Sequence, residues 1–168
     1  NTTNEKRILQ IKGVEKIILA LAIGALIVSI LAIYQKITGQ FIDNAVWQAV
    51  ATRRVVSFFG YPNAVGLFLG PILLVLVGWL IGLVDDSKTI RLINPKSEIL
   101  NSKQTQNSKS KIQKIKIVFV ALTLILSIIS IYFAKSKGAL IGVAAGLVVF
   151  GLLTGKKIRW VTIFVILI

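Results

Sequence analysis

The sequence of 168 residues contains no cysteine and no histidine, and it has only six acidic side chains. The absence of cysteine excludes disulfides and thiolate metal sites. The absence of histidine removes the commonest general base and the commonest metal ligand. Charged residues make up only 15% of the chain, whereas 55% of the residues are hydrophobic. Since a soluble domain of this length would be far more charged, we expect much of the chain to lie in lipid.

The few acidic residues do not suggest a metal site. Asp43 is isolated in its segment, and the pair Asp85 and Asp86 marks the end of an apolar run. We therefore predict no metal and no cofactor for this chain. Because the chain begins at Asn1 and stops at Ile168 within an apolar run, we also expect it to be a fragment that is inactive alone.

Continuous apolar runs predict an all-α, polytopic transmembrane helix bundle. A membrane-spanning helix needs about 20 mostly apolar residues, and these runs lack the alternation of strands. The length of the first run and the lack of a small-residue cleavage site disfavour a signal peptide. We expect four complete spans and a truncated fifth within one membrane domain, namely Ile17–Tyr34, Ala64–Val84, Ile117–Phe133, Ala139–Thr154 and Trp160–Ile168.

The positive charges predict the orientation of these spans. If each run crosses the membrane once, 15 of the 20 Lys and Arg residues fall on one side, in segments 1–16, 85–116 and 155–159. The other five fall in segments 35–63 and 134–138. The positive-inside rule places the first group, and therefore the N-terminus, in the cytoplasm. Because the net charge of +14 lies between apolar runs rather than on one folded face, we expect no nucleic-acid partner.

The segments between the spans are predicted to differ in structure. Segment 85–116 contains the polar run NSKQTQNSKSK, which lacks the apolar residues needed to fold, so we predict a disordered loop. The outer segment 35–63 includes Asn44–Phe59, for which we predict an interfacial helix. Segments 134–138 and 155–159 are predicted to be short turns. Glycines at four-residue spacing predict helix-packing surfaces, in the rows Gly66 and Gly70, Gly78 and Gly82, and Gly138, Gly142 and Gly146.

The cations on the outer side oppose the topological bias and therefore indicate a function. Asn63 is predicted to cap the second span, so the positive end of that helix points outward near Arg53 and Arg54. The fourth span repeats this arrangement after Lys135. Two helix starts with cationic neighbours could hold a phosphate or pyrophosphate between them. Alternatively, the lysines only anchor a short loop at the interface. The candidate substrate-binding residues are Arg53, Arg54, Asn63, Ser136 and Lys137.

Two short motifs carry a family resemblance. The stretch Arg54-Val-Val-Ser-Phe-Phe-Gly-Tyr-Pro-Asn63 resembles a motif of the O-antigen ligase and O-antigen polymerase-like membrane protein superfamily, in which an arginine precedes a Phe-Gly-x-Pro-Asn turn. The later Lys135-Ser-Lys-Gly-Ala-Leu-Ile-Gly142 resembles the Ser-Arg-Gly-Ala segment of that family. The resemblance extends from about Ile17 to the end of the chain.

The resemblance implies a glycosyltransferase of polysaccharide biosynthesis in the bacterial inner membrane. Such enzymes move a glycan from undecaprenyl pyrophosphate to a glycan, lipid or protein acceptor on the extracytoplasmic side. The arginine that matches Arg54 is expected to engage the pyrophosphate, whereas Arg53 has no clear counterpart. Lys137 replaces the arginine of the second motif, which keeps the charge but loses the bidentate geometry. The family's functional histidine has no counterpart here, so the catalytic residues are not predicted.

Two other functions are compatible with the sequence. A membrane solute transporter would place ionisable residues near the bilayer midplane, but the predicted complete spans contain none. If the chain were a non-catalytic membrane subunit, the cations on the outer side would have no explanation. The sequence does not distinguish ligase from polymerase.

Overall fold

The computed structural model describes residues 2–93 and 103–153, which form five α-helices and no strand. The helices are α1 (Thr2–Thr38), α2 (Ala45–Gln48), α3 (Pro62–Ile93), α4 (Lys103–Ala134) and α5 (Lys137–Leu153). The prediction of an all-α chain is confirmed for these residues. The predicted turn 155–159 and the truncated span Trp160–Ile168 lie outside them.

Three of the helices are long and apolar enough to cross a membrane. These stretches are Gly13–Thr38 of α1, Pro62–Asp85 of α3 and Lys111–Ala134 of α4, and the apolar helix α5 is shorter. Large aliphatic side chains such as Ile30, Val118 and Ile125 are more than half exposed on the outside of the bundle. Such a surface suits lipid tails, while every backbone group of a helix is bonded internally.

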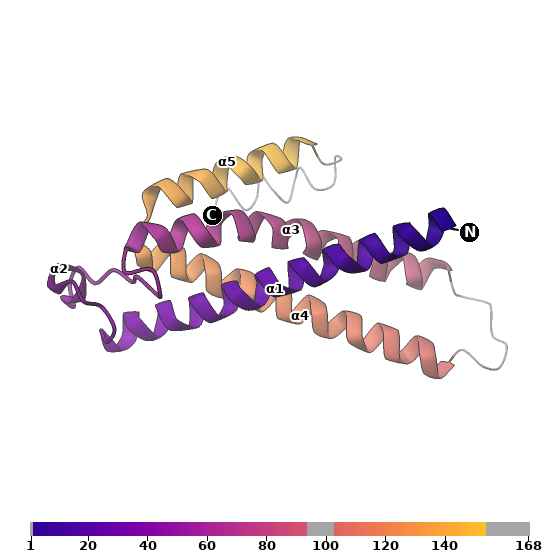
Figure 1. Cartoon of the computed structure of the whole chain (residues 1–168), viewed down its shortest axis with the longest axis horizontal. Coiled ribbons are helices and arrows are strands. Elements are labelled where there is room, and N and C mark those ends of the chain that lie inside the picture. Colours follow the sequence, from indigo (N-terminus) through magenta and orange to yellow (C-terminus); the bar gives the residue numbers. More distant parts are fainter. Residues whose placement is uncertain (1, 94–102, 154–168) are drawn as a thin grey trace.

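The long helices form an elongated bundle (Figure 1). Helix α4 packs against both α1 and α3, and α5 runs along α3. Successive long helices point in opposite directions, so segment 35–63 and the turn between α4 and α5 meet at one end of the bundle, on the left in Figure 1. We call this the loop end. The N-terminal part of α1 lies at the opposite end.

Small polar side chains form the contact between α1 and α4. The Ser29 and Ser127 hydroxyls lie 3.3 Å apart, and Ser130 donates from Oγ to the Ser29 carbonyl oxygen at 3.2 Å. All three side chains are buried. Small residues let helix backbones approach closely in lipid, where apolar burial does not drive association. This serine seam was not predicted from the sequence, where only the spacing of glycines was considered.

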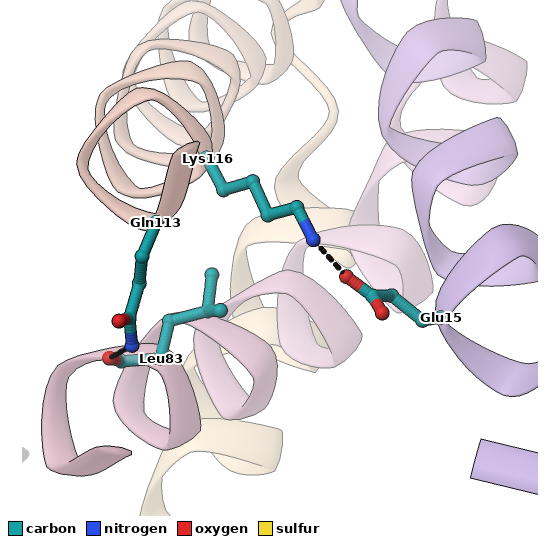
Figure 2. Close-up of polar contacts among 4 residues, drawn as sticks. All are labelled: Glu15, Leu83, Gln113 and Lys116. Carbon is teal, nitrogen blue, oxygen red and sulfur yellow. Dashed lines mark hydrogen bonds and ion pairs between the residues drawn. The ribbon is translucent and has the colours of Figure 1, made fainter. Parts of the chain in front are cut away.

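Two side-chain contacts join the helices toward the opposite end (Figure 2). Lys116 of α4 forms an ion pair with Glu15 of α1, and Gln113 donates to the Leu83 carbonyl oxygen of α3 at 2.9 Å. Helix α4 is therefore tied to both of its neighbours. Both charges of the ion pair are more than a third exposed, so solvent weakens the contribution of the pair to stability.

The helices extend beyond the predicted spans. Helix α1 continues through the predicted tail 1–16, and α3 and α4 cover all of the predicted disordered loop 85–116 except 94–102, which lies outside the described residues. The prediction of disorder is wrong for the helical parts. The physical reason is that Lys, Gln and Arg favour helix, and adding a residue to an existing helix needs no new nucleus.

The outer segment 35–63 contains less helix than predicted. Within Asn44–Phe59 only α2 is helical, and it is four residues long. Asn44 caps it, because its side-chain oxygen accepts from the Val46 N–H at 2.9 Å. After Ala49, which has φ −53° and ψ 132°, the chain turns back toward α1 and α4, and this return path excludes a longer helix.

Candidate functional site

Arg54 lies where α4 ends. Its Nε donates to the Ala134 carbonyl oxygen at 3.0 Å, and its Nη2 donates to the Asn63 side-chain oxygen at 3.1 Å and to the Lys135 carbonyl oxygen at 3.5 Å. The guanidinium thus joins the outer segment to the C-terminus of α4 and the first turn of α3. A cation is favourable at a helix C-terminus. Among the described residues no acceptor is bonded to Nη1, so its N–H groups have no partner in that part of the chain.

The start of α3 differs from the prediction. The helix begins at Pro62, and the Ala64 N–H donates to the Tyr61 carbonyl oxygen at 3.2 Å. The prediction that Asn63 is the N-cap is therefore wrong, because proline occupies the first helical position, for which its fixed φ is suited. Asn63 lies inside the first turn, and its side-chain oxygen accepts from Arg54 instead of from the backbone.

A two-residue connection, Lys135 and Ser136, brings the second motif to the same place. Lys135 has a φ of 52°, in the left-handed region, and this allows α5 to start at Lys137 directly after α4. Ser136 is buried, and its carbonyl oxygen accepts from the Leu140 N–H at 3.1 Å in the first turn of α5. Lys135 and Lys137 are exposed.

A cavity of about 950 Å³ lies between α3 and α5 at the loop end. We call the end of this cavity nearest the loop end its mouth. Three cations line the mouth, namely Arg54, Lys135 and Lys137, and no acidic residue lines the cavity. Its polar wall also includes Asn63 and Ser136. The deeper walls come from residues of α3 and α5, which are Gly66, Leu67, Gly70, Pro71, Leu74, Gly138, Ala139, Gly142 and Val143. The cavity therefore combines a cationic mouth with a mostly apolar interior.

The structure places Arg53 away from this cavity. Its Nη1 donates to the Lys36 and Ile37 carbonyl oxygens at 2.9 and 3.1 Å, and its Nε donates to the Gln48 carbonyl oxygen at 3.2 Å. In return, Lys36 Nζ donates to the Arg53 carbonyl oxygen at 3.0 Å. Arg53 therefore caps the C-terminus of α1. Of the five predicted site residues, the structure brings together Arg54, Asn63, Ser136 and Lys137.

The glycine rows contain positions in close contact with a neighbouring helix and positions in open space. A Cβ at Gly66 would lie 2.8 Å from Ser136 Oγ, and one at Gly70 would lie 3.4 Å from Val143 Cγ2, so both allow α3 and α5 to approach. Gly146 meets the Leu74 side chain in the same contact. A Cβ at Gly138, Gly142 or Gly82 would meet no described atom within 4 Å. Within the described part of the chain these three glycines therefore make no close helix contact, and two of them line the cavity.

One residue that shapes this end of the molecule was not predicted from the sequence. Gln35 of α1 is fully buried, and all its side-chain hydrogen bonds go to the outer segment. Its position at the end of the first apolar run makes it look like an interfacial polar residue. The only indication in the sequence was a single amide side chain at the end of a predicted span. The sequence does not predict which groups this amide bonds.

The site offers no grouping of metal ligands within the described part of the chain, where no three His, Cys, Asp or Glu side chains come together. What it offers is cationic and hydrogen-bonding groups. A guanidinium with free N–H groups, two ammonium groups, a hydroxyl and an amide suit a phosphate or other oxyanion.

The long apolar helices, with their aliphatic outer surface, define this chain as a multi-pass helical membrane protein. No protein-family model, no curated protein and no solved structure matches the chain.

Proposed function

We propose that the chain belongs to an O-antigen ligase or polysaccharide polymerase-like glycosyltransferase, which moves a glycan from undecaprenyl pyrophosphate to an acceptor. The observation that supports this function best is the contact of Arg54 with Asn63 and with the end of α4 at the mouth of the cavity. Arg54 and Asn63 belong to the first motif that resembles the family, and Arg54 also donates to the carbonyl oxygen of Lys135, the first residue of the second motif, 81 positions later in the chain. The cationic mouth suits a pyrophosphate, and the apolar interior suits a lipid.

In the proposed reaction, the bond between the sugar carbon and the pyrophosphate oxygen breaks, and the electron pair leaves with the pyrophosphate. An acceptor hydroxyl oxygen forms the new bond to that carbon, and its proton passes to a water molecule. Arg54 stabilises the negative charge that develops on the pyrophosphate, and Lys135 and Lys137 add to the field.

We further propose a location and a topology for the protein. It lies in the bacterial inner membrane, with the loop end on the extracytoplasmic side and the N-terminus of the chain in the cytoplasm. Helix α5 is a fourth span, and the apolar run Trp160–Ile168 begins a fifth. The positive-inside distribution of Lys and Arg supports this orientation.

The test uses cells that lack the protein and are complemented with variants. We expect Arg54→Ala to abolish glycan transfer while the protein stays in the membrane, because the leaving pyrophosphate loses its guanidinium. We expect Arg54→Lys to retain partial transfer, since the charge remains and the bidentate geometry is lost. Mass spectrometry of lipid extracts should show undecaprenyl-linked oligosaccharide accumulating with Arg54→Ala, and less of it with Arg54→Lys.

Arg91→Ala is the matched control, because it removes an arginine near the opposite end of α3. We expect it to complement fully. Normal transfer by Arg54→Ala would contradict the proposed role. No accumulation in cells that lack the protein, together with unchanged surface polysaccharide, would contradict the glycosyltransferase and favour a transporter.

A further inference from the structure

The side chain of Gln35 is fully used in holding the outer segment. Its Nε2 donates to the Phe41 and Ser57 carbonyl oxygens at 3.0 and 3.1 Å. Its Oε1 accepts from the Val56 and Ser57 N–H groups at 3.0 and 2.7 Å. An amide side chain has two donor hydrogens and two acceptor lone pairs, so each is occupied by backbone of the same segment.

The backbone held by Gln35 adopts a conformation that is costly by itself. Ser57 has a φ of 50°, in the left-handed region that residues with a Cβ rarely adopt. Val55, Val56 and Ser57 are buried, so their polar backbone groups need partners inside the protein. Gln35 provides these for two of the three N–H groups, and Ser57 Oγ donates to the Val28 carbonyl oxygen at 2.9 Å.

Arg54 directly precedes this anchored stretch. Its own N–H donates to the Trp47 carbonyl oxygen at 3.1 Å, and the Val55 N–H reaches the Phe133 carbonyl oxygen at 3.4 Å, which is a long contact. The backbone N–H groups that follow Val55 are therefore held by the two bonds to Gln35 Oε1, while the Ser57 hydroxyl bond to Val28 holds the side chain of the same turn. If the backbone at Val56 and Ser57 shifts, the guanidinium moves away from Ala134 and Asn63.

We propose that Gln35 is a positioning residue that holds the Arg54 guanidinium at the cavity mouth. Gln35 does not line the cavity, so it acts through the backbone of Val56 and Ser57. The importance of this positioning for pyrophosphate recognition rests on the proposed function, whereas the placement of Arg54 by Gln35 does not.

The test measures the reaction of Arg54 with phenylglyoxal, whose carbonyl carbons are attacked by guanidine nitrogens, in protein reconstituted into lipid nanodiscs. Peptide mass spectrometry follows the rate at Arg54. In wild type the reaction should be slow, because Nε and Nη2 are hydrogen-bonded. Gln35→Met keeps the length of the side chain and removes its hydrogen bonds, so we expect the Arg54 rate to rise roughly threefold or more.

Two further variants keep the result interpretable. Ser130→Ala also removes a buried hydrogen-bonding side chain, but from the seam between α1 and α4, and we expect the wild-type Arg54 rate. Gln35→Glu keeps acceptor oxygens and loses the amide donors. We therefore expect the Arg54 rate to rise less than in Gln35→Met. This variant replaces Gln35→Met in the test if Gln35→Met does not fold. An Arg54 rate that is unchanged in the Gln35 variants, or raised equally by Ser130→Ala, would overturn the positioning role.

The same assay separates this inference from the proposed function. Farnesyl pyrophosphate, added as a soluble probe for a lipid pyrophosphate, should slow the Arg54 reaction in wild type and much less in Gln35→Met. If it gives no protection in wild type while Gln35→Met still accelerates the reaction, the positioning of Arg54 by Gln35 stands and the proposed pyrophosphate recognition fails.

Discussion

At the scale of single residues, the adjacent arginines have different surroundings. Arg53 donates to carbonyl oxygens of α1 and of the outer segment, whereas Arg54 donates to the end of α4 and to Asn63. The sequence alone could rank them only through the family motif. The difference arises because successive side chains of an extended chain point in opposite directions, and residues 53–56 are neither helix nor turn.

The Arg53 cap leads to a prediction at Gly39. This glycine has a φ of 74°, and a Cβ there would lie 2.7 Å from Arg53 Nη2. Gly39→Ala should therefore lower the free energy of unfolding by about 1–2 kcal/mol through backbone strain, and further through displacement of Arg53. The measurement is the thermal unfolding midpoint in detergent.

Two other glycines provide graded controls. Gly60 has a φ of 66° but open space around it, so Gly60→Ala should show only the strain. Gly82 lies in α3 with nothing within 4 Å of an added Cβ, and Gly82→Ala should be neutral or slightly stabilising. Equal midpoints for the Gly39 and Gly60 variants would argue against the Arg53 contact.

At the scale of elements, the existence and class of the long helices could be predicted, but their ends and contacts could not. The apolar runs locate the cores of α1, α3, α4 and α5, because about 20 apolar residues are needed to cross a bilayer. The polar ends of these helices carry no such pattern. The start of α3 was predicted two residues late, because Asn63 is a good cap by residue type and Pro62 was not considered as the first helical residue.

The candidate site was partly predictable for the same reason. Arg54, Asn63, Ser136 and Lys137 belong to recognisable local motifs, so they could be named from the sequence. Gln35 could not, because its partners are backbone groups of an irregular segment 6 to 22 residues later in the chain, whose path no local pattern specifies. The spacing of the glycines predicted that helices pack together there, but it did not predict which glycines lie in the contact between α3 and α5.

The contact of α3 with α5 leads to a prediction that contrasts two glycines. Gly66 is buried against Ser136, and a Cβ would lie 2.9 Å from Ser136 Cβ. Gly66→Val should push the helices apart and destabilise the protein by about 1–3 kcal/mol. Gly142→Val places the same side chain in open space on α5, so we expect little loss of stability. Thermal unfolding of the two variants makes the comparison, and similar losses would contradict the assigned contact.

At the scale of the whole molecule, cations are concentrated at both ends, but their settings differ. At the loop end, three of them line one cavity. Among the residues described near the opposite end, Lys116 is paired with Glu15. The arrangement of the helices alone does not indicate which end of the bundle faces the cytoplasm. The proposed orientation therefore rests on the count of Lys and Arg on each side.

The orientation can be measured because the chain contains no cysteine. Asp43 is exposed in the outer segment, and Lys111 is exposed in the first part of α4. A membrane-impermeant maleimide added to spheroplasts should label Asp43→Cys, and it should label Lys111→Cys only after permeabilisation. The reverse pattern would invert the topology and place the cavity mouth in the cytoplasm.

The hydrogen bonds of Gln35 and Arg54 also differ in how early they can form during synthesis. Gln35 bonds backbone 21 and 22 residues later in the chain, whereas Arg54 must wait for Ala134, which is 80 residues later. At the usual elongation rate this delay is roughly 4–16 s. The outer segment can thus acquire its bend on α1 before α4 and α5 exist. Helices α4 and α5, which are made later, would then dock onto a loop that already presents its guanidinium.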